Sequence, residues 1–349
     1  MAVLDVIVAP ALAPDALIGL ESHLLGAVVT RQTPPVALIY SSPGRYISIG
    51  RYHLYAGGAQ PGGIGAYRRL TGGRVVGAGQ GWLGLALILP SRIALLKEDA
   101  ARLKPEQIMN RYARGMLAGL RALGLDCFYP GRDAITFERR ELAMCSFETD
   151  ASGAMLFESA LAVNRGMENL VHDLELFESD GALPCRMYDS DSATTLGREL
   201  KREIAFDELA DAIAAGYEGL LGETRRRELT AIETADAERR GRELAASGWL
   251  NRIAPQAGTL KKNRIAGQLG AIEAAVELES DGTIAVVTLS GDFIANSPGV
   301  AELENELRGE RLDLASVSHA VTKIFGPGGN FFLGAGELSN LVRLIAGVN

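Results

Sequence analysis

Apolar and polar positions along the chain form two kinds of pattern. Short uninterrupted apolar runs predict buried strands, and apolar residues spaced three and four positions apart predict amphipathic helices. The strand runs are residues 4–8, 35–40, 46–50, 85–89 and 154–163, and the helical patterns are residues 14–25, 104–123 and 206–221. Because the two kinds of element alternate, we expect an α+β fold, with an open mixed sheet and flanking helices packed on it.

Local sequence also predicts how some elements are connected. The runs 35–40 and 46–50 flank the turn sequence 41–44 (Ser-Ser-Pro-Gly), so we expect them to pair as a hairpin. From residue 192 to 250 the chain is expected to be helical. Its charge-rich part, residues 223–242, has alternating charges at helical spacing, which is typical of a solvated helix face.

Residues from about 255 predict a second, small α+β domain. Its expected strands are 257–260, 270–278 and 283–290, and its expected helix is 300–307. We interpret Lys261–Arg264 as a solvated turn; the alternative is a basic cluster that meets an acidic carrier domain. We interpret His319 and the glycines of residues 325–330 and 334–336 as loop structure. The predicted domains are therefore residues 1–250 and 255–349.

Composition narrows the class of protein. The 349 residues carry a formal net charge of −8, which argues against general nucleic-acid binding, and 47% of them are hydrophobic, as in ordinary globular proteins. The three cysteines are an odd number without paired spacing, so we expect no disulfide framework. We find no signal peptide, no membrane-spanning run and no metal-ligand spacing, and we expect a cytoplasmic protein.

One stretch carries candidate chemistry. Six glycines lie within residues 72–84, and Arg68, Arg69 and Arg74 precede or begin that stretch. Glycines let backbone N–H groups close around an anion, and arginines pair with phosphate or carboxylate. The stretch therefore predicts an anion-binding loop. The alternative is a glycine-rich hairpin whose arginines are solvated.

Three segments resemble a known family. The segment 68–73 (Arg-Arg-Leu-Thr-Gly-Gly) is similar to the Arg-Arg-x-Ser/Thr-Gly-Gly segment of lipoate-protein ligases and octanoyltransferases, in the biotin/lipoate A/B protein ligase superfamily. The segment 131–136 resembles the family's Gly-Arg-Asn-Asp-Leu-Thr turn, and Gly291-Asp292-Phe293 resembles a signature of the ligases' accessory C-terminal domain. The resemblance implies a ligase-like fold with that accessory domain.

The resemblance also implies roles for individual residues. It assigns the acyl-phosphate end of the substrate to Arg68, Arg69, Thr71, Gly72, Gly73 and the adjoining Arg74. It assigns the nucleotide to Arg132 and Asp133, and it implies ATP with Mg²⁺ as cofactors. The implied partners are a small acyl acid and a lipoyl-type carrier domain, or another acyl acceptor protein, with no nucleic acid and no membrane.

The chain departs from the family at the catalytic lysine. Alignment of the family's Gly-Arg-Lys-Ile-Ser/Ala-Gly hairpin places Glu141 at the lysine position, where a carboxylate would repel the acyl phosphate. A shift in register would instead present Arg139 or Arg140 as the cation. Cys127 could form a thioester, as in some octanoyltransferases, with Arg132 lowering its pKa; a packed, inert thiol is the simpler interpretation for Cys127 and the other two cysteines.

Two hypotheses follow. The first is a divergent ligase or acyltransferase that acts on a lysine of a carrier domain. The second is a non-catalytic relative that binds an acyl group, a nucleotide or a carrier domain as a scaffold or regulatory subunit. Trp82 and Met144 replace smaller family residues, so we also predict a partly filled acyl tunnel.

Overall fold

The main body of the protein is a seven-stranded mixed sheet. The computed structural model describes residues 3–55, 65–96, 103–166, 192–253 and 260–347. The strand order is β10 (Thr224–Arg226), β1 (Leu4–Ala9), β2 (Val36–Tyr40), β6 (Trp82–Leu89), β9 (Met155–Ala162), β8 (Arg140–Thr149) and β7 (Ala134–Phe137). β10, β1 and β2 are parallel, and the remaining neighbours are antiparallel.

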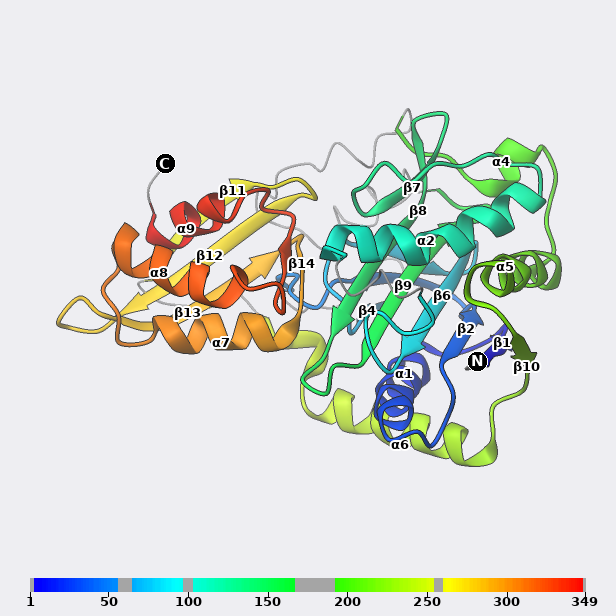
Figure 1. Ribbon diagram of the computed structural model, residues 1–349, viewed down its shortest axis with the longest axis horizontal. Coiled ribbons are helices and arrows are strands. Elements are labelled where there is room, and N and C mark those ends of the chain that lie inside the picture. Colours follow the sequence, from blue (N-terminus) through cyan, green and yellow to red (C-terminus); the bar gives the residue numbers. More distant parts are fainter. Residues whose placement is uncertain (1–2, 56–64, 97–102, 167–191, 254–259, 348–349) are drawn as a thin grey trace.

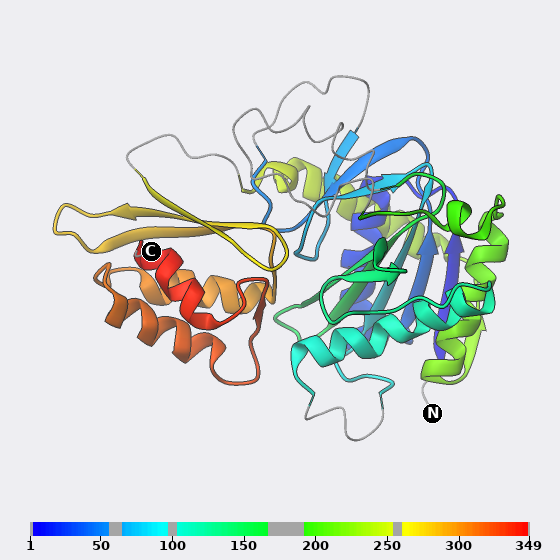
Figure 2. The same ribbon diagram turned by 90° about the horizontal axis from the view of Figure 1, so that it is seen from above.

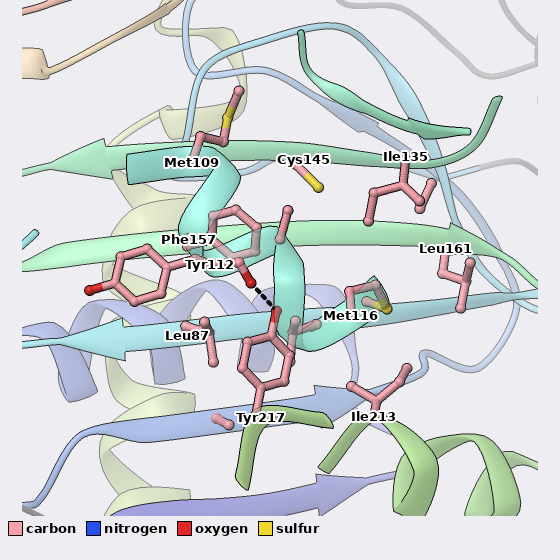
Figure 3. Close-up of a cluster of buried hydrophobic side chains, with 14 of the residues drawn as sticks. Leu87, Met109, Tyr112, Met116, Ile135, Cys145, Phe157, Leu161, Ile213 and Tyr217 are labelled. Carbon is pink, nitrogen blue, oxygen red and sulfur yellow. Dashed lines mark hydrogen bonds between the residues drawn. The ribbon is translucent and has the colours of Figure 1, made fainter. Parts of the chain in front are cut away.

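Helices cover both faces of this sheet (Figure 1). α1 (Pro14–Val29) and α6 (Ala231–Ala246) pack on one face, and α2 (Pro105–Ala122) and α5 (Phe206–Leu221) pack on the other. The apolar stripes that predicted α1, α2 and α5 are the buried faces. Met116, Ile213, Leu87 and Leu161 belong to the hydrophobic cluster between these helices and the sheet (Figure 3), where the Tyr217 hydroxyl also donates to the Tyr112 carbonyl oxygen at 2.8 Å.

A second, smaller sheet consists of β4 (Gly65–Arg68), β3 (Arg45–Ile49) and β5 (Val76–Gly79). The predicted hairpin of residues 35–40 and 46–50 is therefore wrong. β2 is bonded on its two edges to β1 and β6, and β3 is bonded on its two edges to β4 and β5. The turn sequence between them changes sheets instead of closing a hairpin.

The segment 223–242 is not one helix. Its first residues form β10, and Arg225 of β10 and Arg227 just after it pair with the buried Asp5 of β1. α6 begins only after Thr230, whose hydroxyl accepts from the Glu233 N–H while the Glu233 carboxylate accepts from the Thr230 N–H. Charge spacing indicated a helix, but the first part pairs with β1 as a parallel strand, and its arginines meet a buried carboxylate that the spacing could not reveal.

The C-terminal part has its own core. β11 (Lys261–Ala266), β12 (Ala271–Leu278) and β13 (Ile284–Gly291) form an antiparallel sheet, one face of which is covered by α7 (Ser297–Leu307), α8 (Leu314–Phe325) and α9 (Leu338–Ala346), as Figure 2 shows. Two predictions fail here. Lys261–Arg264 lies in the edge strand β11, and His319 lies in α8. Short elements complete the described chain: β14 (Ile294–Ala295), β15 (Phe332–Leu333), α4 (Leu196–Leu200) and η4 (Trp249–Asn251).

The two parts contact each other closely. Tyr52 stacks on Phe293, and Phe147 stacks on Phe331, each with ring centroids 4.4 Å apart. The architecture confirms the predicted fold class, a mixed open sheet with flanking helices plus a small C-terminal α+β domain. The exact boundary between residues 250 and 255 stays a prediction. Among the described residues, no helix is both long and apolar enough to cross a membrane.

Candidate functional site

The arginine- and glycine-rich turn after β4 is buried between the two parts of the protein. Thr71 is fully buried, and the Gly73 N–H donates to the Phe293 carbonyl oxygen at 2.6 Å. A Cβ atom on Gly72 would lie 2.3 Å from that same oxygen, and Gly73 has a φ of +87°. Both glycines are therefore required for close contact with the accessory domain.

Arg68 is held entirely by backbone. Its side chain is 0% exposed, and its guanidinium donates to five carbonyl oxygens at 2.7–3.2 Å. These carbonyls belong to Gly50, Arg51, His53, Trp249 and Leu250. Burial, with repulsion from neighbouring arginines, lowers the pKa of Arg68 to about 9. The Arg68 guanidinium therefore joins residues 50–53 to residues 249–250.

Arg69 and the backbone around it are also paired internally. Arg69 donates to the carbonyl oxygens of Ser48, Gly72 and Arg74 at 3.0, 2.7 and 2.6 Å. The Thr71 N–H donates to the Glu158 carboxylate at 3.3 Å. Burial raises the pKa of Glu158, and Arg69 partly offsets that rise. The Arg69 guanidinium and the Thr71 N–H, two donors that could receive an anion, are therefore already engaged.

Arg74 lies in a buried cluster with two carboxylates. It donates to Asp133 through Nε at 2.7 Å and Nη2 at 3.2 Å, and to Glu141 through Nη1 at 3.1 Å. The side chains of Arg74 and Asp133 are 0% exposed, and that of Glu141 is 12% exposed. Burial raises the pKa of Glu141, Asp133 raises it further, and Arg74 opposes both effects. One guanidinium thus faces two carboxylates at the position that the alignment gave to the catalytic lysine.

The other candidate cations lie outside this cluster. Arg132 and Arg139 are exposed, and Arg139 occupies the turn between β7 and β8 with a φ of +71°. Arg140 pairs with Glu199 at 3.0 Å and with Glu138 at 3.3 Å. The structure brings Arg74, Asp133 and Glu141 together. Arg132 acts on Glu141 only through its charge, which lowers the pKa of that carboxyl, and the printed ion pairs of Arg140 are with Glu138 and Glu199.

The described cysteines are packed thiols. Cys127 and Cys145 are buried, and Cys145 points into the core beneath α2 in Figure 3. Burial raises the pKa of each thiol to about 12, and Asp126 and Glu199 add to the effect at Cys127. Such surroundings disfavour the thiolate that a thioester mechanism needs. Cys185 lies outside the described residues.

A small cavity lies beside the buried turn. It measures about 30 Å³ and is lined in part by Ser48, Arg69, Trp82, Met144 and Glu158. That volume holds about one water molecule, whereas ligand pockets measure roughly 300–1,000 Å³. Trp82 and Met144, the two residues expected to narrow an acyl tunnel, both contribute to its wall.

Among the described residues, the candidates Arg68, Arg69, Gly73 and Asp133 are not free to hold ATP with Mg²⁺. A triphosphate needs free N–H or guanidinium donors, and those of Arg68, Arg69 and Gly73 donate to carbonyl oxygens. A magnesium ion needs free carboxylate oxygens, and both oxygens of Asp133 accept from Arg74. In the described part of the chain, no group of three or more histidine, cysteine, aspartate or glutamate side chains could hold a metal ion.

Sequence reasoning missed two buried glutamates. Glu21 of α1 is fully buried, and neither carboxylate oxygen has a hydrogen-bond partner among the described residues. Burial, and then Glu158, raise its pKa. The available signal was its place beside the apolar stripe of α1. Glu148 is buried near the C-terminal end of β8, and it accepts from the Ser297 N–H of α7 at 2.7 Å.

Glu148 gives stability a defined pH dependence. Burial raises its pKa to about 7, while an unfolded chain would keep the usual value near 4.5. Folding therefore favours the protonated form, and the free energy of unfolding should fall as pH rises from about 4.5 to 7, by about 2–3 kcal/mol. We expect Glu148→Gln to remove this loss.

Urea unfolding at pH 5 and pH 8 measures the effect. Glu279→Gln is the matched control, because Glu279 is exposed on the accessory domain and should leave the pH dependence unchanged. If Glu148→Gln and wild type lose the same stability between the two pH values, Glu148 is not the group responsible.

The fold matches that of lipoate-protein ligases. LipL1 of P. falciparum, in complex with lipoate, superimposes with a TM-score of 0.73 and 13% identity over 99% of both chains. Lipoate-protein ligase A bound with ATP gives 0.56 and 16% identity, over 72% of this chain and 100% of that one. A bipartite lipoate-protein ligase from Thermoplasma acidophilum, studied with its E2 lipoyl domain, gives 0.54 and 16% identity, over 74% and 99%.

The chain therefore has the lipoate-protein ligase fold, as its sequence resemblance predicted. The match to LipL1 spans the accessory domain as well as the main sheet. No protein-family model matches the sequence, and no curated protein matches it. Identities this low support the fold and leave the activity to the chemistry of the site.

Proposed function

We propose that this protein is a non-catalytic relative of the lipoate-protein ligases that binds a lipoyl-type carrier domain without acylating it. The observation that carries the proposal is the Arg74–Asp133–Glu141 cluster. Where the family uses a lysine to stabilise the acyl phosphate, this cluster has one cation shared by two carboxylates. Its excess negative charge would repel an acyl phosphate.

The small cavity and the engaged donors of the turn favour a carrier domain over an acyl chain or a nucleotide as binding partner. An acyl chain of eight carbons needs far more than the 30 Å³ beside the turn. A nucleotide needs hydrogen-bond donors for its phosphates, and the Arg69 guanidinium of the turn already donates to the carbonyl oxygens of Gly72 and Arg74. A carrier domain binds on the surface and needs neither, and the Thermoplasma neighbour was studied with its lipoyl domain.

A transfer assay and a binding assay together test the proposal. The full chain is incubated with ATP, Mg²⁺, lipoate or octanoate, and an unmodified lipoyl domain, and the mass of that domain is measured. Binding of the same domain is measured by calorimetry. We expect a one-to-one complex and an unchanged mass.

Two results would overturn the proposal. A mass gain equal to one acyl group would make the protein a ligase, which is the other hypothesis raised by the sequence. If the domain neither binds nor gains mass, the carrier domain is not the partner.

A further inference from the structure

A second cavity lies between the main sheet and the accessory domain. It measures about 530 Å³, within the range of small-molecule sites. Arg51, Tyr52 and Arg252 line it from one part of the protein, and Thr288, Ser297, Val300 and Glu304 are among the residues that line it from the other. We call it the interdomain cavity. It is separate from the cavity beside the glycine turn, with which it shares no lining residue.

Two arginines in this cavity are held by one indole ring. The Arg51 and Arg252 guanidinium carbons lie 5.0 and 4.8 Å from the Trp249 ring centroid. Trp249 is itself fixed, because its Nε1–H donates to the Arg68 carbonyl oxygen at 2.7 Å. Stacking on an aromatic face orients a guanidinium and leaves its edge free to bind an oxyanion.

The two guanidiniums are incompletely paired. Arg252 has no side-chain hydrogen bond and no ion pair with any described residue. The buried Nε of Arg51 has no hydrogen-bond partner among the described residues, and the nearest carboxylate oxygen, of Glu148, lies 3.8 Å away. Repulsion from Arg51 adds to burial in lowering the pKa of Arg252. Glu148 and Glu304 partly balance the two positive charges, and the Arg51 Nη1–H donates to the Leu70 carbonyl oxygen at 3.2 Å. The Arg51 Nε–H and the Arg252 guanidinium keep donors without a hydrogen-bond partner among the described residues.

The opposite wall supplies an apolar surface and one carboxylate. Leu289, Pro298 and Val300 contribute apolar atoms. The Glu304 carboxylate accepts from the Leu289 N–H at 3.4 Å, and burial raises its pKa. A ligand here would meet two cations on one side and a largely apolar surface on the other.

We propose that the interdomain cavity binds a small molecule that carries an oxyanion, a carboxylate or a phosphate, between Arg51 and Arg252, with its apolar part against Leu289 and Val300. The oxyanion supplies the acceptors that the two guanidiniums lack, and charge-assisted hydrogen bonds of this kind are strong. Because residues from both parts line the cavity, the ligand would also hold the two parts together. This site does not depend on the carrier-domain proposal.

Calorimetry on the full chain tests the site with n-butyl phosphate and pentanoate as separate probes and n-butanol as the neutral control. We expect at least one anion to bind with a Kd below about 1 mM, and butanol not to bind. The tighter anion identifies which oxyanion the site prefers. Trp249 fluorescence should change on binding, since the indole contacts both arginines.

Two variants distinguish binding in the interdomain cavity from non-specific binding of anions to positive surface charge. Arg252→Gln should weaken binding about 10- to 100-fold, the loss of one charge-assisted hydrogen bond. Arg242→Gln is the matched control, because Arg242 is 72% exposed on α6, and it should bind as wild type does. The proposal is overturned if neither anion binds in this range, if butanol binds as well as the anions, or if the two variants behave alike.

Discussion

Replacing Arg74 with methionine is expected to lower the free energy of unfolding by about 3–5 kcal/mol. Methionine keeps much of the side-chain volume, so the loss comes from charge and not from a cavity. Without Arg74, the fully buried Asp133 carboxylate has no cation, and Glu141 loses its partner as well. Leaving a buried charge unpaired is the costly step.

A second variant distinguishes this explanation from simple misfolding. The double variant Arg74→Met with Asp133→Leu removes both buried charges, and it should recover most of the lost stability. Urea unfolding at pH 7, followed by circular dichroism, measures both variants. If Arg74→Met alone costs less than about 1 kcal/mol, the ion cluster is not a structural element.

Replacing Arg68 with lysine is expected to cost about 3 kcal/mol or more, although the charge is kept. The guanidinium reaches five carbonyl oxygens in two distant segments, residues 50–53 and 249–250. A lysine ammonium has three donors at a single point, so several buried carbonyls would lose their partner, at about 1–3 kcal/mol each.

Arg132→Lys is the matched control for this variant. Arg132 was assigned to the substrate by the same family resemblance, but its side chain is exposed. We expect its substitution to change stability by less than about 0.5 kcal/mol. Equal stability of the two variants would mean that Arg68 is free to bind a ligand, contrary to the hydrogen bonds described above.

Hydrophobic periodicity predicted the elements better than their pairing. The stripes of α2 and α5 and the apolar run of β6 lie where the sequence indicated them, because burial requires those patterns. Pairing depends on distant segments. β2 and β3 look like a hairpin locally, but each is bonded to other strands. β11 escaped detection because an edge strand carrying lysine and arginine has little apolar signal.

For the candidate site too, the sequence indicated which residues matter but not what they contact. The sequence singled out Arg68, Arg69 and Arg74, and all three are buried: Arg68 among backbone carbonyls, Arg69 beside the small cavity and Arg74 in the ion cluster. It could not show what they donate to. Hydrogen bonds from Arg68 to residues near 250, and the contact of Gly72 with Phe293, join segments about 180–220 positions apart. Only the folded chain shows that the Arg68 guanidinium and the Gly73 N–H already donate to backbone carbonyl oxygens.

The central claim is that an acyl adenylate has no place beside the glycine turn. Calorimetric titration of the wild-type chain with a non-hydrolysable lipoyl adenylate, in which a sulfamoyl group replaces the phosphate, tests it most directly. The expected result is no binding at the turn. One-to-one binding at micromolar concentration that persists in Arg252→Gln, and so does not use the interdomain cavity, would contradict the claim.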